Sequence, residues 1–186
     1  MKFNEHYNLS GKHATFSPSQ PQWLRYSNDK LVEVFENKQA VQRGTELHAW
    51  AEQTINLRIK QARSKKTLCA YVNDAIGFGM ETERVLYYSD HFYGTADAIC
   101  FDEKNQFLRI HDLKTGKHPA KIEQLLVYAA LFCLEYRIDP FTIGMELRIY
   151  QNDEIITFIP TAQEVKDTMK NIIDKNNYLE KYSKGV

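Results

Sequence analysis

The apolar residues of this 186-residue chain change their spacing along the sequence, and this change limits the folds open to it. They recur every three or four positions in residues 39–63 and 67–76, which predicts two helices. The pattern then changes: the runs RVLYYS and FYGTADAICF are rich in aromatic and β-branched residues, and FLRIHDLK alternates, which predicts three consecutive strands. A helical spacing returns over residues 119–137. A chain of this kind must pack helices against a sheet.

The ends of the chain complete the pattern. The runs MELRIY and EIITFI flank QND and predict a hairpin, and Thr161 is expected to cap a final helix over about residues 161–182. Near the N-terminus, FSPSQPQWLRYS predicts a helix start, because Ser and Pro suit a first helical turn. We therefore expect an α/β fold of the α+β kind, with a central mixed β-sheet flanked by helices in αβββαβ order. We expect one domain, residues 1–186, with a core over about residues 17–160.

Composition narrows the setting of the protein. The 24 Lys and Arg residues balance the 24 Asp and Glu residues, so a nucleic acid would have to be bound by a local basic patch. The three cysteines form no CxxC motif, which indicates reduced thiols inside a cell. No apolar run approaches the roughly 18 to 20 residues that span a bilayer. We therefore expect a soluble, cytoplasmic protein without a membrane partner.

Two carboxylates and a lysine fall together on the predicted strands. Asp112 and Lys114 are two residues apart, so they share a face of their strand while Leu113 faces the core. A hairpin about the DEKNQ turn places Asp97 opposite either His111 or Asp112. Two carboxylates that close repel one another, and a divalent ion such as Mg²⁺, which prefers oxygen ligands, would relieve the repulsion. A lysine beside them is placed to orient or deprotonate an attacking water molecule.

Each of these signals also has an ordinary structural explanation. Asp-x-Lys at the end of a strand is common in soluble proteins. A single helical histidine such as His48, which shares a helix face with Glu52, is usually a surface or core residue. Gln124 and Tyr128, one helical turn apart, also suit the polar margin of an amphipathic helix. Only the combination of these residues favours a functional site.

In chain order, the same residues resemble the PD-(D/E)XK nuclease superfamily, in its RecB-type and phage exonuclease-like branch. The resemblance covers about residues 17–150 and implies a restriction-endonuclease-like core. It rests on the order of helix, three strands, helix and strand, on the Ser-rich run SPSQPQWLRY, and on four short motifs. The motifs are GxxxH at Gly44 and His48, GxxD at Gly94 and Asp97, D-x-K at Asp112 and Lys114, and QxxxY at Gln124 and Tyr128.

The resemblance implies a role for each matching residue. His48, Asp97 and Asp112, together with the backbone carbonyl of Leu113, would bind one or two Mg²⁺ or Mn²⁺ ions. His48, Asp97, Asp112 and Lys114 would form the catalytic set, with Lys114 positioning the attacking water. Gln124 and Tyr128 would hold nucleic acid or support the metal site. Glu52 is a further acid that the motifs do not require.

Two basic groups are candidates for contact with DNA. The first follows the His48 helix, and its default explanation is a solvated face. The second lies beside the proposed site, where phosphates would pass, so Lys117 and Lys121 are expected to bind nucleic acid with an affinity that falls as salt rises. The first group is Arg58, Lys60, Arg63, Lys65 and Lys66, and the second is Lys114, Lys117, His118 and Lys121.

The expected function is a metal-dependent DNA nuclease that hydrolyses phosphodiester bonds, as an exonuclease in phage-type recombination or DNA processing. A structure-selective endonuclease on the same fold and a catalytically silent DNA-binding or assembly module are the alternatives. The partners implied are DNA, a single-strand annealing or other recombination protein and further copies of the chain, in the cytoplasm of a bacterium or of a phage-infected host cell.

Two cofactors are not expected. Some relatives in the superfamily frame the core with four cysteines that hold an iron–sulfur cluster, one of them before the His motif and three near the C-terminus. Here no cysteine precedes Cys69 and none follows Cys133, so we expect no iron–sulfur cluster. The run LKTGKH lacks the first glycine and the Ser or Thr of a phosphate-binding P-loop, so we expect no nucleotide.

Overall fold

The computed structural model describes residues 5, 7–9, 14–116 and 119–184. Its residues group into two compact units, Met1–Thr45 and Glu46–Val186, and each is described by itself. Helix α1 (Asn28–Asn56) contributes residues to both units. The assignment of residues 1–186 to one domain stays a prediction.

The first unit contains two short 3-10 helices, Tyr7–Leu9 and Pro21–Arg25, and the first part of α1. The predicted helix start in FSPSQPQWLRYS forms the second of these short helices, with Pro21 in its first turn. Trp23 fixes this segment, because its indole Nε1 donates a hydrogen bond of 3.1 Å to the Ser17 carbonyl and its ring packs against Phe16.

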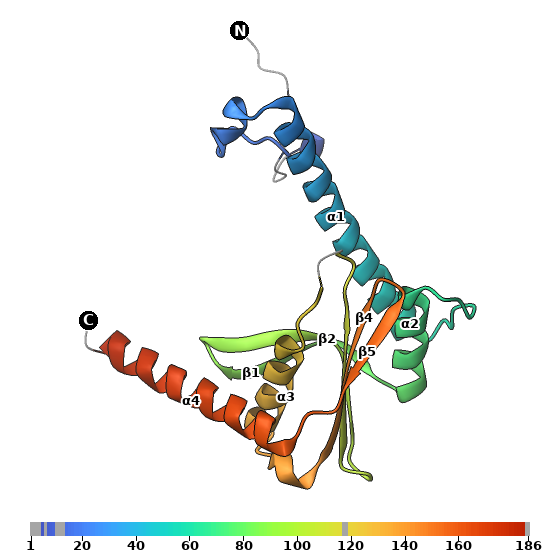
Figure 1. The fold of residues 1–186 in the computed structure, drawn as a ribbon, viewed down its shortest axis with the longest axis vertical. Helices are drawn as coiled ribbons and strands as arrows, with labels where there is room; N and C mark the ends of the chain where they lie inside the picture. The colour runs from blue at the N-terminus through green and yellow to red at the C-terminus, as the bar shows by residue number, and fades with distance from the viewer. Residues whose placement is uncertain (1–4, 6, 10–13, 117–118, 185–186) are drawn as a thin grey trace. The chain divides into compact units, whose positions relative to one another are not determined.

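The second unit is built on a five-stranded sheet in the order β1-β2-β3-β4-β5 (Figure 1). The strands β3 and β4 run parallel and the other neighbours run antiparallel, so the sheet is mixed, as predicted. The bounds of the strands are β1 Glu81–Ser89, β2 Phe92–Asp102, β3 Phe107–Leu113, β4 Gly144–Gln151 and β5 Glu154–Phe158.

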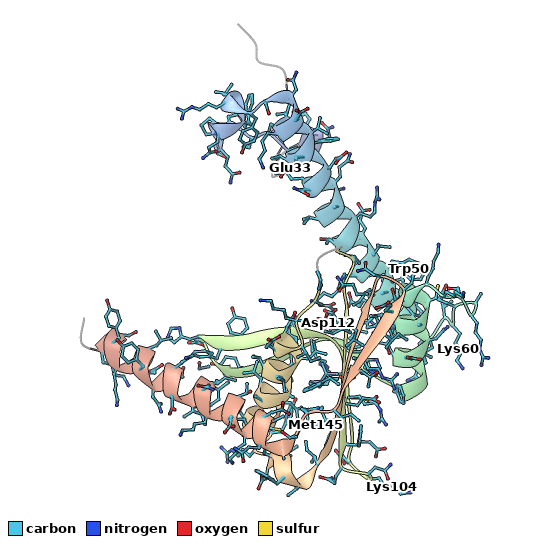
Figure 2. All side chains as sticks on the ribbon, in the orientation of Figure 1. Glu33, Trp50, Lys60, Lys104, Asp112 and Met145 are labelled. Carbon is cyan, nitrogen blue, oxygen red and sulfur yellow. The ribbon has the colours of Figure 1, made fainter. Side chains whose placement is uncertain are left out.

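Helices cover the sheet, with separate apolar clusters on its two faces. Against one face lie α2 (Thr67–Phe78) and the last turns of α1, where Ala51 and Tyr71 pack with Leu113. Against the other lie α3 (Glu123–Glu135) and α4 (Ala162–Lys184), where Met145 of β4 is part of the larger cluster (Figures 1 and 2). The described residues therefore form a mixed α/β unit with a five-stranded sheet and four helices, which confirms the general class.

Several element ends were predicted correctly, and each has a local cause. Helix α2 begins at Thr67, as predicted, and ends at Gly79, whose φ of 65° is the left-handed conformation that closes helices. Thr161 caps α4, since its Oγ1 accepts from the Glu164 N–H at 3.2 Å while a Glu164 oxygen accepts from the Thr161 N–H at 2.7 Å. The hairpin of β4 and β5 turns at Asn152 and Asp153, whose positive φ values suit a two-residue turn.

Three helix boundaries were predicted wrongly, the two ends of α1 and the start of α3. The helix expected over residues 39–63 runs over Asn28–Asn56 and stops because Arg58 takes a φ of 54°, with the Ile59 N–H bonded to the Thr54 carbonyl at 3.0 Å. Helix α3 begins at Glu123 and not at Pro119. The amide of Gln151 holds the preceding segment outside the helix: it accepts from the Ala120 N–H at 3.0 Å and donates to the Gly116 carbonyl at 2.7 Å.

None of the helices among the described residues is long and apolar enough to cross a membrane.

Candidate metal centre

The register of β2 and β3 brings the two predicted aspartates together. Ala98 pairs with His111, so Asp97 and Asp112 occupy the next opposed positions as the hairpin opens. The Asp97 Oδ2 atom also accepts a hydrogen bond of 2.8 Å from the Leu113 N–H. This confirms the predicted alignment of Asp97 with the end of β3. Figure 2 labels Asp112 near the end of the sheet at which α3 begins.

The side chain of Lys114 links the aspartates to α3. Its Nζ atom lies 3.0 Å from Oδ1 and 2.9 Å from Oδ2 of Asp112, and it donates to the Gln124 Oε1 atom at 2.9 Å. The Gln124 Nε2 atom in turn donates to the Tyr128 hydroxyl at 3.2 Å. The D-x-K and QxxxY residues therefore form one hydrogen-bonded chain that runs from β3 to α3.

His48 reaches the same place from the last turns of α1. Its Nδ1 atom lies 3.6 Å from the Asp97 Oδ2 atom, and both side chains are mostly buried. Asp97 therefore has His48 beside it and the Asp112–Lys114 pair across the β2–β3 ladder, although Asp112 is not among the ligand atoms close enough to His48 and Asp97 to share one cation with them.

The structure adds Glu83, a residue that sequence reasoning missed. One ligand atom each from His48, Glu83 and Asp97 lies within 4.8 Å of the others, which is a spacing suited to a single cation. Glu83 belongs to β1 and has a φ of 50°, which is unusual for a non-glycine residue inside a strand. The run ETERV carries no motif, so nothing in the sequence indicated this position.

The backbone irregularity at Glu83 extends to the facing strand. The β1–β2 ladder pairs Thr82 with Ala98 and Arg84 with Ala96. Ala96 and Ala98 are two residues apart, yet they pack in the clusters on opposite faces of the sheet. The alternation of faces therefore changes phase between them, at Asp97, opposite Glu83. This local break directs both acids toward His48 instead of into an apolar cluster.

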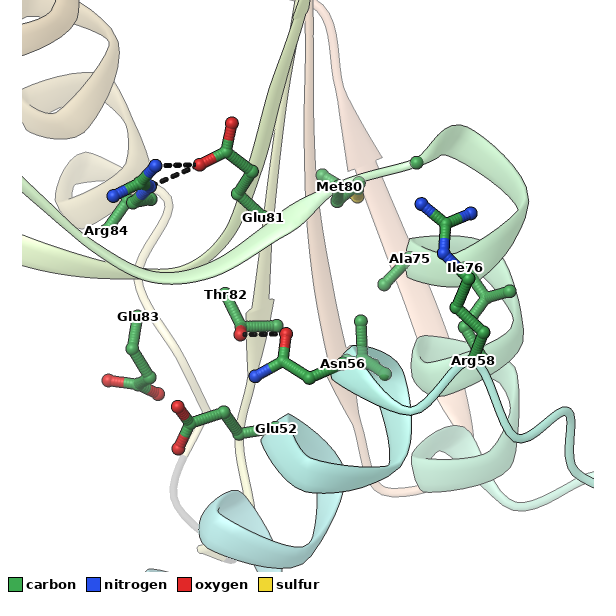
Figure 3. A pocket seen from close by; sticks show the side chains of 12 residues that line it. Glu52, Asn56, Arg58, Ala75, Ile76, Met80, Glu81, Thr82, Glu83 and Arg84 are labelled. Atoms are coloured by element: carbon green, nitrogen blue, oxygen red, sulfur yellow. Dashed lines mark hydrogen bonds and ion pairs between the residues drawn. The ribbon is translucent and has the colours of Figure 1, made fainter.

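A second acid from α1 faces Glu83 across a small cavity of about 400 Å³ (Figure 3). The carboxylates of Glu52 and Glu83 point toward one another in this view, from α1 and β1 respectively. Next to them, the Thr82 hydroxyl donates to the Asn56 amide oxygen at 3.0 Å and ties β1 to the end of α1. Glu52, the optional extra acid of the sequence analysis, thus lies beside the cluster.

Neighbouring carboxylates raise the pKa values of two acids of the candidate site. Burial, and then the neighbouring Asp112 carboxylate, raise the pKa of Asp97 to about 6, against the opposing effects of the Leu113 N–H, His48 and Lys114. Burial and the Glu52 carboxylate raise the pKa of Glu83, which His48 opposes. Repulsion among carboxylates therefore makes the site unfavourable when it holds negative charge alone.

Asp112 is the most buried acid of the candidate site. It is 1% exposed, and its Oδ2 atom makes no hydrogen bond, with only the ion pair to Lys114 beside it. The Lys114 ammonium lies 2.9 Å from this oxygen and compensates its charge, so the fit of a metal ion is judged on the donor set of the site. The donor set of one imidazole and several carboxylate oxygens therefore fits a hard divalent cation such as Mg²⁺ or Mn²⁺.

The structure describes some of the remaining predicted residues and leaves two of them out. The N–H and C=O groups of one strand residue point to the same side, so the Leu113 carbonyl is directed toward β2 and Asp97; its role as a ligand stays a prediction. Lys121 is exposed just before α3, and the basic residues Arg58, Lys60, Arg63, Lys65 and Lys66 are exposed as well. Lys117 and His118 lie outside the described residues.

Comparisons of the chain with protein-family models, with curated proteins and with solved structures gave no match.

Proposed function

We propose that the chain is a Mg²⁺- or Mn²⁺-dependent DNA nuclease of the PD-(D/E)XK superfamily, in its RecB-type and phage exonuclease-like branch, with a restriction-endonuclease-like core. One observation carries the proposal: the chain of contacts that places Asp97 opposite Asp112, with Lys114 bonded to Asp112 and Gln124. A strand ending in Asp-x-Lys is common, but an opposed second aspartate with a histidine 3.6 Å away is a far more specific arrangement.

In this proposal the acids and His48 hold the metal. Asp97, Asp112, Glu83 and His48 would supply the protein ligands, and the Leu113 carbonyl would complete them. A divalent ion bound there supplies positive charge to the scissile phosphate and to the attacking water. Burial, and then the like charge of Asp112, raise the pKa of Asp97, and a bound cation would relieve the repulsion between the two carboxylates.

Lys114 performs the step that depends on the chain alone. Its ammonium group is fixed between Asp112 and Gln124, so it points at a defined place beside the carboxylates. There it orients the attacking water and balances the negative charge that builds up on the phosphoryl oxygens. Gln124 and Tyr128 set the position of Lys114 and border the path of the nucleic acid, with Lys117 and Lys121 as further phosphate contacts.

The test uses end-labelled linear DNA and closed circular DNA with Mn²⁺. We expect degradation that stops in EDTA and falls at least about 100-fold in Lys114→Ala, which is the size of loss typical of a charge-stabilising catalytic group. Lys170→Ala, at an exposed position of α4, is the matched control and should retain full activity. Cleavage that survives both EDTA and Lys114→Ala would overturn the mechanism.

The two DNA forms separate the remaining functions. Loss of the linear form alone identifies an exonuclease of recombination or DNA processing, whereas cutting of the circle identifies an endonuclease. Binding without cleavage of any DNA identifies a silent DNA-binding or assembly module. In the first case, a single-strand annealing or other recombination protein and further copies of the chain are the partners to examine by pull-down and by mass measurement in solution.

A further inference from the structure

Two exposed tyrosines lie on the β1–β2 hairpin in line with the candidate metal centre. Tyr87 and Tyr93 pair directly across the two strands, and their rings stack with centroids 6.4 Å apart and planes 29° apart. They are 45% and 63% exposed, and Val85, in the next pair on the same face, is 55% exposed. These residues form an apolar and aromatic row that faces solvent.

The row leads to the metal ligands. Along β2, Tyr93 and Thr95 come before Asp97 in the chain. The neighbouring strand β1 runs in the opposite direction, so Tyr87 and Val85 lie on the same side of Glu83 although they follow it in the chain. Tyr93 and Asp97 are four residues apart, or about 13 Å along a strand. About four stacked nucleotides, at roughly 3.4 Å each, span that distance.

Local contacts hold the row in place. The Tyr87 hydroxyl donates to the Asp90 carboxylate in the hairpin turn at 2.9 Å, and the Tyr87 N–H donates to Glu135 of α3 at 2.9 Å. These bonds use the backbone N–H and the hydroxyl of Tyr87, so they leave uncovered the ring faces that are turned away from the Tyr87–Tyr93 stack. A cross-strand pair of this kind also stabilises a hairpin, but that role does not require the rings to be so exposed.

From these observations we infer that Tyr87 and Tyr93 form a stacking platform for the bases of single-stranded DNA on its way to the metal centre. Any base can stack on an aromatic ring, so the platform selects unpaired strands without selecting a sequence. No Lys or Arg lies in the row, so this part of the binding depends on bases and not on phosphates. That the bound strand leads to a metal centre rests on the proposed function. That the two tyrosines bind single-stranded DNA does not.

The experiment measures binding in EDTA, where metal-dependent cleavage does not occur. Short single-stranded oligonucleotides carry the fluorescent base 2-aminopurine at successive positions from one end. We expect quenching that is strongest at one position within about four nucleotides of that end, because stacking on a ring quenches the base. Tyr87→Ala with Tyr93→Ala should weaken binding about tenfold or more, since stacking contributes about 1–3 kcal/mol per base.

Two variants separate stacking from hairpin stability. Tyr87→Phe with Tyr93→Phe keeps the rings and should retain binding and quenching. Tyr178→Ala removes a tyrosine of α4 that is more exposed than either of them and should change nothing. The lost affinity should also vary little between low and high salt, unlike phosphate contacts.

The outcomes are distinct from those of the nuclease test. Wild-type affinity in the double alanine variant, equal loss in the phenylalanine variant, or tighter binding of duplex than of single strands would each overturn the platform. Position-specific quenching in a protein that never cleaves DNA would support the platform and reject the proposed nuclease function.

Discussion

At the scale of single residues, Glu83 is held in a backbone conformation that ordinarily costs about 1–3 kcal/mol. Strain of that size persists where the surrounding structure enforces it, and here the phase change at Asp97 across the hairpin does so. This conformation places the Glu83 carboxylate beside His48 and Asp97. If the proposed cation binds there, the strain at Glu83 serves binding and not folding, and the two can be measured separately.

Replacing Glu83 separates these two effects. Glu83→Gly should raise the free energy of unfolding without metal by about 1 kcal/mol, because glycine accepts a positive φ freely. The same variant should weaken Mn²⁺ binding about tenfold, because one ligand is lost. Calorimetric titration and thermal unfolding measure the two quantities. Glu81→Gly, a neighbour paired with Arg84, is the control and should not weaken Mn²⁺ binding.

His111 titrates on the opposite face of β3 from Asp112. Burial, and then the nearby Arg148 and Arg109, lower its pKa from 6.5 to about 3, and its Nε2 atom is buried without a hydrogen bond. The folded protein thus keeps the ring neutral over a range in which the unfolded chain protonates it.

This difference predicts a loss of stability in mild acid. Because the unfolded state binds the extra proton below pH 6.5, the His111 contribution is present above that pH and is lost as pH falls toward 3. Between pH 7.5 and pH 5 the loss should be about 2 kcal/mol. His111→Phe, which suits a site against Phe78, should be less sensitive to pH in urea unfolding. Parallel curves for the two proteins would contradict the prediction.

At the scale of elements, the contact of β2 with α3 depends on Gly94. A Cβ atom at this position would lie 2.9 Å from the Tyr128 ring, closer than such contacts allow. The glycine of the GxxD motif therefore lets α3 approach β2, and it indirectly places Tyr128, Gln124 and Lys114.

Gly94→Ala should accordingly impair both packing and cleavage. We expect a loss of about 1–3 kcal/mol in unfolding free energy, as for other overpacked sites. In a Tyr128→Ala background the same change should cost much less, because the clashing ring is gone, and a double-mutant cycle measures this coupling. Gly77→Ala is the control, since nothing lies within 4 Å of its added Cβ. Additive losses would show that the ring is not the cause.

The elements also show what the sequence can predict. The aromatic, β-branched and alternating runs identified β1, β2 and β3. The DEKNQ turn aligned Asp97 with the end of β3. Both predictions were possible because strand patterns and hairpin register are local properties. The start of α3 and the end of α1 were missed because Gln151 and Arg58 set them, through a long-range hydrogen bond and an unexpected left-handed residue. Glu83 was missed for the second reason, since side-chain type does not reveal a backbone irregularity.

At the scale of the whole molecule, the candidate centre joins elements that are distant in sequence. His48 comes from α1, Glu83 and Asp97 from neighbouring strands, and Asp112 from β3. A cation held by all of them would bind the folded chain far better than the unfolded chain, so binding should stabilise the second unit as a whole.

Thermal unfolding tests this linkage without any substrate. At a Mn²⁺ concentration 100 times the dissociation constant, the free energy of unfolding should rise by about 2.7 kcal/mol, and EDTA should reverse the rise. Asp112→Asn should abolish the effect. Asp167→Asn, at an exposed position of α4, should leave it intact. An equal rise in both variants would place the ion elsewhere.

The left-handed backbone at Glu83 has one more consequence, because β1 is an edge strand of the sheet. An open edge offers a regular row of amide and carbonyl groups to any other extended chain, and so invites aggregation. The kink at Glu83 interrupts that row. Further along it, the Tyr87 N–H already donates a hydrogen bond to the Glu135 carboxylate. The residue that brings a third acid to the candidate metal centre should therefore also hinder edge-to-edge strand pairing between copies of the protein.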